Sequence, residues 1–236
     1  MKCGVVVFPG SNCDHDAYHV LEQVMELEVE FLWHDQDHLN GCDLVVLPGG
    51  FAYGDYLRAG ALAALSPVMG AVKRHGQAGG WVLGICNGFQ MLLESGMLPG
   101  AMRLNRSLRF ECRDVWLRVE RSDLGFTSDY EAGQLIRVPI AHAEGNYIDS
   151  DSALDELEEN RQVVFRYVAP DGSDSDEANI NGSARAIAGI VNKQGNVLGM
   201  MPHPERCSEE ILGNSDGLPL FRSLLRASRE AMRMAQ

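Results

Sequence analysis

The stretch WVLGICNGFQ, residues 81–90, decides the fold of this chain. Its first five residues form an apolar run typical of a strand buried in a parallel sheet, and residues 87–94 have the pattern of a helix. Cys86 stands at the junction, with one glycine two residues before it and another two residues after it. Only small neighbours let the chain turn sharply beneath a reactive side chain, so the stretch predicts a nucleophile elbow.

Strand and helix patterns alternate between the N-terminus and this stretch. Such alternation predicts an α/β fold, in which a mostly parallel twisted sheet is flanked by helices on both faces. Asn12 and Asp14 offer capping oxygens to the first helix, and the second helix is expected to run through Pro67. The expected strands are 4–8, 29–33 and 44–47, and the second helix is expected at 61–74.

The second half of the chain has a different pattern. Three predicted strands follow one another there, which indicates a small antiparallel addition to the sheet, and residues 169–183 are rich in the polar residues of an exposed loop. No repeat or low-complexity linker occurs, so we expect a single domain over residues 1–236. The later strands are expected at 115–119, 135–141, 163–168, 186–191 and 197–201, and an amphipathic closing helix at 218–234.

The charge of the chain limits its partners. It has 33 acidic and 20 basic residues, for a net charge of −13, which argues against a nucleic-acid or membrane-surface partner. The six cysteines form no Cys-x-x-Cys pair and favour a reducing cytoplasm. The first apolar run is too short for a signal peptide or a membrane span. No P-loop motif is found, so we expect no ATP site and no cofactor in this chain.

Cys86 has the surroundings that nucleophilic catalysis needs. The N-terminus of the following helix places positive potential beside the sulfur and favours the thiolate. The backbone amide of Asn87 is a candidate oxyanion donor. A buried structural thiol is the alternative, and it is the interpretation we adopt for the other five cysteines.

A candidate base for this thiol occurs in the sequence MPHPE, residues 201–205. Pro204 favours an extended conformation at His203, and residues two apart on an extended segment project to the same side. Glu205 can therefore orient the imidazole, which gives a triad in the order Cys, His, Glu. A surface turn is the alternative for so short a motif, but its position after an apolar strand favours the site.

Glycines and histidines elsewhere give weaker signals. Gly49 and Gly50 close a predicted strand, and Gly50 is a candidate second oxyanion donor or part of a plain tight turn. His15 and His19 have metal-binding spacing, but a solvated first helical turn explains them equally, and we expect no metal. His142, followed by Glu144, either has a binding or interface role or marks a strand end.

Together these motifs resemble the class I glutamine amidotransferases. Their Gly-x-Cys-x-Gly-x-Gln elbow is matched from Gly84 to Gln90, and their base and orienter match His203 and Glu205. More narrowly, the chain is similar to the glutaminase subunits of phosphoribosylformylglycinamidine synthase. The stretches that carry this similarity are PGSNCD at 9–14, GGFAYGDYLRAG at 49–60, RFEC at 109–112 and GMMPHPE at 199–205.

The resemblance implies a reaction and partners. Cys86 would attack glutamine to form a thioester, and His203 would protonate the leaving ammonia and then activate water, with Gln90 and Gly49 in the substrate site. Asp55 and Arg58, with His142 and Glu144, would belong to a substrate or interface loop. A large synthetase subunit, and usually a small third protein, would receive the ammonia and hold ATP and magnesium.

Two departures and two rival functions accompany the resemblance. His15 replaces a more ordinary polar residue, and the loop at 170–178 is unusually acidic. A cysteine hydrolase of the related intracellular protease and chaperone superfamily, or a catalytically silent docking module, are the alternatives. A basic stretch is either a partner-facing surface or a solvated loop. It contains Arg103, Arg106, Arg109 and Arg113.

Overall fold

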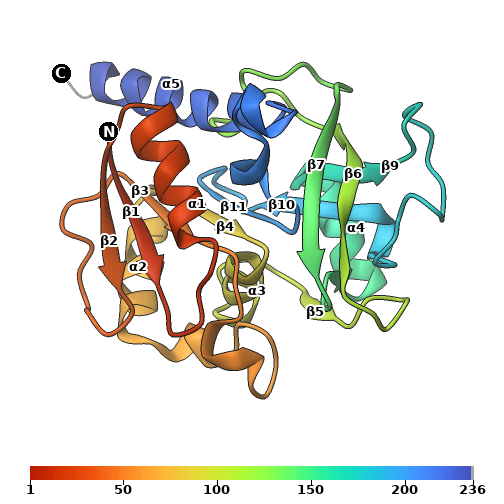
Figure 1. Ribbon diagram of the computed structural model, residues 1–236, viewed down its shortest axis with the longest axis horizontal. Coiled ribbons are helices and arrows are strands. Elements are labelled where there is room, and N and C mark those ends of the chain that lie inside the picture. Colours follow the sequence, from red (N-terminus) through yellow and green to blue (C-terminus); the bar gives the residue numbers. More distant parts are fainter. Residues whose placement is uncertain (235–236) are drawn as a thin grey trace.

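The computed structural model describes residues 1–234 and contains a nine-stranded sheet with helices packed on it (Figure 1). The strands of this sheet are β1 (Lys2–Val7), β2 (Glu28–Trp33), β3 (Leu44–Leu47), β4 (Trp81–Ile85), β6 (Glu111–Val119), β7 (Leu135–His142), β9 (Val163–Val168), β10 (Ile187–Val191) and β11 (Val197–Met200). Their order across the sheet is β2-β1-β3-β4-β11-β10-β9-β6-β7.

One half of the sheet is parallel, as predicted. Strands β2, β1, β3, β4 and β11 pair in parallel, and the central ones are apolar and almost wholly buried because helices cover both faces. Leu47 is paired with Gly84, so the chain segments that follow β3 and β4 leave the sheet side by side. The carboxyl ends of β3, β4 and β11 therefore meet at one edge, where ligands collect in α/β sheets.

The other half of the sheet is antiparallel and continues from β11 through β10, β9, β6 and β7. Buried and part-exposed residues alternate along β7, as expected for a strand with one covered face. A separate ribbon of β5 (Ala101–Arg103) and β8 (Asn146–Ile148) lies beside it, followed by a helix, α4 (Asp151–Glu159). Neither this ribbon nor this helix was predicted from the sequence.

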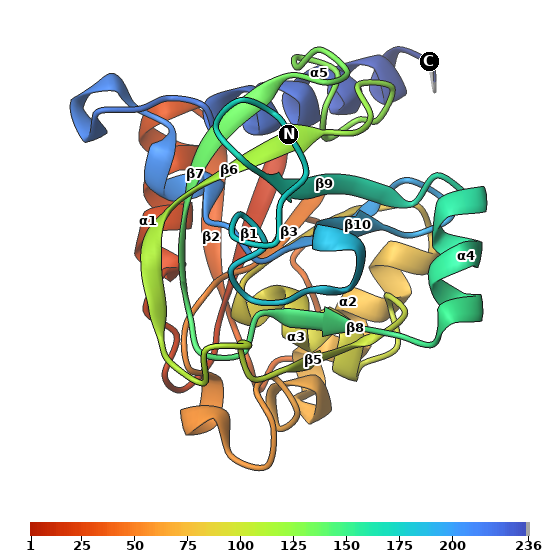
Figure 2. The same cartoon turned by 90° about the vertical axis from the view of Figure 1, so that its right-hand side faces the viewer.

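Helices cover both faces of the parallel half. Figure 2 shows α1 (Asp14–His19) on one side of the strands and both α2 (Pro67–Gln77) and α3 (Asn87–Glu94) on the other. The closing helix α5 (Leu218–Met234) has the predicted bounds and packs across one end of the sheet (Figure 1). Among the residues described, no helix combines the length and apolar character needed to cross a membrane.

Two helix starts differ from the prediction. Cys13 is the N-cap of α1 and no side chain caps that helix, so the capping roles predicted for Asn12 and Asp14 are wrong. The predicted helix at 61–74 is broken, because Ser66 is extended and Pro67 begins α2. Proline disfavours the helical region for the residue before it but fits the first helical position, so it starts a helix more readily than it continues one.

The loop at 169–183 is only partly exposed, which corrects its prediction. Its last residues turn inward, and the side chains of Asn181 and Ser183 are buried. Both donate hydrogen bonds to the Gly145 carbonyl, at 2.7 and 3.0 Å. The polar composition of this segment therefore supplies buried hydrogen-bonding groups as well as a solvated surface.

Candidate active site

Cys86 lies in a strained turn between β4 and α3. Its backbone φ of 51° and ψ of −104° fall outside the common regions for a residue with a side chain, and its amide donates to the Met200 carbonyl at 2.8 Å. A Cβ at Gly84 would lie 2.7 Å from the Gly88 carbonyl oxygen, and a Cβ at Gly88 would collide with the Leu47 carbonyl. The turn therefore depends on both glycines.

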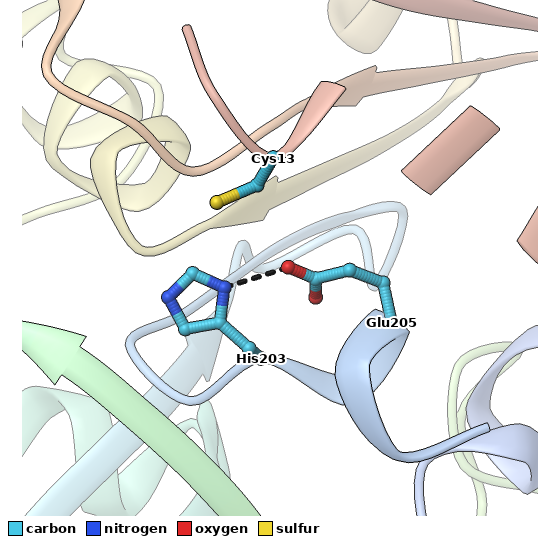
Figure 3. Close-up of side chains that lie close together, drawn as sticks. All are labelled: Cys13, His203 and Glu205. Carbon is cyan, nitrogen blue, oxygen red and sulfur yellow. Dashed lines mark hydrogen bonds and ion pairs between the residues drawn. The ribbon is translucent and has the colours of Figure 1, made fainter. Parts of the chain in front are cut away.

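His203 and Glu205 form a buried pair immediately after β11. The His203 Nδ1 lies 2.6 Å from Glu205 Oε1, as Figure 3 shows, and the His203 amide donates to the Pro139 carbonyl of β7 at 2.8 Å. Glu205 belongs to a 3-10 turn, Pro204–Cys207, and not to the extended segment predicted from the sequence. The proline limits the extended conformation to His203 and then starts the turn that brings the carboxylate back to the ring.

The environment of His203 favours its charged form. Burial lowers the pKa of the imidazole, but the Glu205 carboxylate and the Cys86 sulfur outweigh burial and raise it well above its ordinary value. Ile85 at the end of β4 is paired with Met200 at the end of β11, so the nucleophile and base candidates follow neighbouring strands and share one site. Within the described residues, His203 Nε2 and Glu205 Oε2 are buried without a hydrogen-bond partner. The Nε2 atom is thus available to a substrate or to Cys86.

The turn after β3 borders the same site. A Cβ at Gly49 would lie 2.6 Å from His203 Cε1, so the imidazole occupies the space that a side chain would take. Gly50 forms an isolated bridge with Ser11, and a Cβ there would lie 2.8 Å from the Ser11 Cα. The two glycines let this turn fit between the segment 10–12 and the imidazole.

Asn87 and Gln90 connect the elbow to two loops. The Asn87 side chain accepts from the Ala52 amide at 3.0 Å and donates to Asp55 Oδ1 at 3.2 Å and Gln90 Oε1 at 2.9 Å. Gln90 in turn donates to the Glu144 carbonyl at 2.6 Å. Both ends of the Gln90 amide are bonded to the protein, so the residue fixes the walls of the site.

The side chains of Asp55 and Arg58, predicted to share a loop, contact different parts of the protein. Burial raises the pKa of Asp55 to about 6, the Glu144 carboxylate adds to that rise and Asn87 opposes it. Both residues lie beside the elbow, because Asn87 donates to the Asp55 carboxylate and Gln90 donates to the Glu144 carbonyl. Arg58 forms a two-pronged ion pair with Glu94 at the exposed end of α3, at 2.9 and 2.6 Å.

His142 lies at the end of β7 and is buried. Burial lowers its pKa to about 4, with the nearby His203 charge adding to the effect, so the ring is neutral near pH 7. Asn105 holds it: its Oδ1 lies 3.1 Å from His142 Nδ1 and accepts from the Gly145 amide, and its Nδ2 donates to the His142 and Arg109 carbonyls. Asn105 was not predicted from the sequence, because a lone asparagine carries no spacing signal.

Cys13 and Arg206 are two further residues that the sequence analysis did not place in the site. Arg206 Nη2 lies 2.9 Å from Cys13 Sγ, and ligand atoms of Cys13, His203 and Glu205 all lie within 4.8 Å of one another (Figure 3). The only signal was the PGSNCD stretch that contributed to the resemblance. By contrast, His19 pairs with Glu209 at 2.7 Å, and His15 contacts the Phe31 ring edge-on.

Comparisons with known proteins agree with this geometry. A family model described as a CobB/CobQ-like glutamine amidotransferase domain matches residues 1–217. The phosphoribosylformylglycinamidine synthase subunit PurQ of Gloeobacter violaceus is 57% identical, covering 95% of this chain and 97% of that protein. The PurQ subunit of Moorella thermoacetica is 55% identical, covering 95% of each chain.

A solved structure extends the agreement to three dimensions. A chain in the structure of PurLQS from Thermotoga maritima superposes with a TM-score of 0.85 at 44% identity, covering 96% of this chain and 98% of that one. A putative GMP synthase component from Thermoplasma acidophilum, at 19% identity and a TM-score of 0.64, shares the fold. The chain therefore belongs to the CobB/CobQ-like glutamine amidotransferases and, among them, to the PurQ subunits of phosphoribosylformylglycinamidine synthase.

Proposed function

We propose that this chain hydrolyses glutamine with Cys86 as nucleophile, His203 as acid and base, and Glu205 as the group that orients and charges the imidazole. The observation that carries the proposal is the buried His203–Glu205 pair, at 2.6 Å, beside a cysteine held in a strained elbow. A nucleophile, a base and an orienting carboxylate are the parts that covalent acyl transfer needs. The two rival functions do not account for the family membership.

The reaction proceeds in two halves. The Cys86 thiolate attacks the side-chain amide carbon of glutamine, and the tetrahedral intermediate collapses to a γ-glutamyl thioester while His203 gives its proton to the departing ammonia. His203 then takes a proton from water, the hydroxide attacks the thioester, and glutamate leaves as the thiolate re-forms. The raised pKa of His203 suits the first half, because the imidazole begins protonated.

The remaining candidates bind the substrate. The amides of Gly50 and Asn87 stabilise the oxyanion in this proposal, and the adjacency of β3 and β4, which precede the two turns, supports it. Asp55 and Glu144 supply negative charge that fits the α-ammonium group of glutamine. His142, neutral and held by Asn105, adds no competing charge beside His203.

Ammonia passes to a synthetase subunit that converts formylglycinamide ribonucleotide to the amidine and holds the ATP and magnesium. A small third protein completes the complex, and a reducing cytoplasm suits the free cysteines. Exposed apolar side chains near the site form a candidate docking surface. Leu57 is 83% and Leu108 75% exposed, and the Phe51 and Phe110 rings lie 6.3 Å apart, connecting the two loops.

The basic stretch contributes less to this surface than the sequence suggested. Arg106 donates to the Asp176 and Asn179 carbonyls, and Arg113 pairs with Glu111. These two arginines are engaged within the chain, so a partner-facing role is better tested at Arg103 and Arg109. Reversing both charges should weaken complex formation at moderate salt, and unchanged binding would leave the apolar surface as the docking site.

Glutamate release from glutamine tests the proposed reaction. The chain is assayed alone and with the matching synthetase subunit, as wild type, as Cys86→Ser and as the control Cys112→Ser, whose thiol is exposed and distant in sequence from the elbow. Cys86→Ser should lower the rate at least about 10³-fold, because a catalytic set loses its nucleophile. Release that survives in Cys86→Ser would remove Cys86 from this role.

A further inference from the structure

Cys13 places a second thiol against the base of the proposed reaction. It is the N-cap of α1, is 2% exposed, and lies beside Gly49 next to the His203 ring. A Cβ at Gly49 would lie 3.1 Å from Cys13 Sγ and 2.6 Å from His203 Cε1, so sulfur and imidazole border the same small space. The proposed hydrolysis gives Cys13 no role.

The three buried groups around this space are of the types that bind zinc. A thiol, an imidazole and a carboxylate are its usual protein ligands, and here their ligand atoms lie within 4.8 Å of one another. The ligands of one zinc ion lie roughly 3.5 Å apart, so the Cys13 sulfur needs only a small displacement. The 2.6 Å contact between His203 and Glu205 must open by roughly 1 Å.

We propose that Cys13, His203 and Glu205 form a binding site for a thiophilic divalent cation such as Zn²⁺, whose binding switches off the glutaminase. The cation displaces the protons of the Cys13 thiol and the His203 imidazolium into solvent, and it occupies the groups that the hydrolysis needs. Inhibition rests on the proposed function. Binding does not, because all three ligands are present whatever reaction the chain catalyses.

A cation can bind at this site only if the Arg206 guanidinium moves away from Cys13. Its Nη2 contacts Cys13 Sγ at 2.9 Å and its Nε pairs with Asp16 at 3.1 Å, so a positive charge stands beside the ligands. The Arg206 side chain is 34% exposed and Asp16 46% exposed, which leaves the guanidinium room to move into solvent. Burial also raises the pKa of the Cys13 thiol, with His203 and Arg206 opposing the rise, so a cation must compete with a proton for the sulfur.

Binding is measured with Cd²⁺, whose bond to a thiolate gives an ultraviolet absorption band. Cys86→Ser is the parent protein, so that the nucleophile cannot contribute. The parent and its Cys112→Ala derivative should bind one Cd²⁺ with equal affinity, and the Cys13→Ala derivative should bind at least about tenfold more weakly, since it lacks a ligand. Cys13→Ser repeats the test with a side chain of similar size, and thermal unfolding shows whether each variant is folded.

Two results would overturn the site. Loss of the band in Cys86→Ser would make the nucleophile the ligand, and undiminished affinity in the folded Cys13→Ala and Cys13→Ser derivatives would place the cation elsewhere. In the active complex, Zn²⁺ should inhibit glutamate release and a chelator should restore it. Cys13→Ala should raise the inhibition constant at least about tenfold, with the inhibition of each protein measured relative to its own metal-free rate. Equal inhibition of wild type and Cys13→Ala would contradict the proposed switch.

Discussion

The parallel and antiparallel halves of the sheet contribute differently to the site. The parallel half supplies short motifs at strand ends, where Cys86, Gly49 and His203 follow β4, β3 and β11. The antiparallel half supplies a wall held by buried hydrogen bonds, in which Asn105 fixes His142. The groups proposed to react thus lie in one half of the sheet, and the groups that hold them in place lie in the other. Substitutions can therefore test each half separately.

Glu205→Gln also tests the reacting half, and after Cys86→Ser it should have the largest effect, lowering kcat about 10²-fold. The amide keeps the size of the side chain but removes the charge that raises the pKa of His203. The imidazole then loses its proton at lower pH, so the alkaline limb of the pH–rate profile should move to lower pH. A reduced rate with an unmoved alkaline limb would limit Glu205 to holding the ring in position.

The same substitution has a stability signature with a definite sign. A histidine whose folded pKa is raised stabilises the fold below its unfolded pKa, and this stabilisation is lost as pH rises through the folded value. Glu205→Gln should therefore reduce the pH dependence of the unfolding free energy on the alkaline side of neutrality. Denaturant unfolding across that range measures it, with the exposed-pair variant Glu156→Gln as control.

Asn105→Ala tests the supporting half. Asn105 is fully buried and makes four hydrogen bonds, and their loss leaves the Gly145 amide and the His142 ring without their partner. The free energy of unfolding should fall by about 2 kcal/mol, and urea unfolding measures it. Asn160→Ala, at an exposed helix end, should change stability far less. Equal losses in the two variants would contradict the assigned role.

Asp55→Asn lies between the two halves and should have a smaller effect. With a pKa of about 6, Asp55 gains its charge between pH 5 and 7, so KM for glutamine should fall across that range in wild type and change little in the variant. The contribution of Asp55 to stability should fall as pH rises from about 4 to 6, because the folded state holds this proton more tightly, and Asp55→Asn should remove that contribution. A KM that is independent of pH in wild type would remove Asp55 from substrate binding.

Arg58→Ala should have the smallest effect of this set. The Arg58 side chain is 66% exposed, so solvent screens its ion pair with Glu94 and the pair adds little to stability. Glutaminase activity of the free chain and the unfolding free energy should stay near wild type. A large loss of activity in the free chain would return Arg58 to the substrate loop suggested by the resemblance.

Sequence reasoning predicted the parallel half better than its partner. Residues 81–94 contain a buried strand, a turn that requires glycine and a helix, and each of these has a local sequence signal. The bounds of β4 and α3 are therefore those expected. The β5–β8 ribbon has two three-residue strands, too short for any periodic signal. The contacts of Asn105 join residues up to 40 positions apart, and no local pattern records them. The roles of the site residues and the single-domain organisation stay predictions.

The glycines around Cys86 and His203 have a consequence for protein engineering. Gly49, Gly84 and Gly88 mark places where the imidazole, a neighbouring turn or a strand carbonyl occupies the volume of a side chain. Grafting only the cysteine, histidine and glutamate onto another α/β scaffold would leave this volume filled by whatever residues the host carries. A graft would therefore need these glycines together with the three site residues. Mutant libraries made to improve the enzyme should keep the three glycine positions constant.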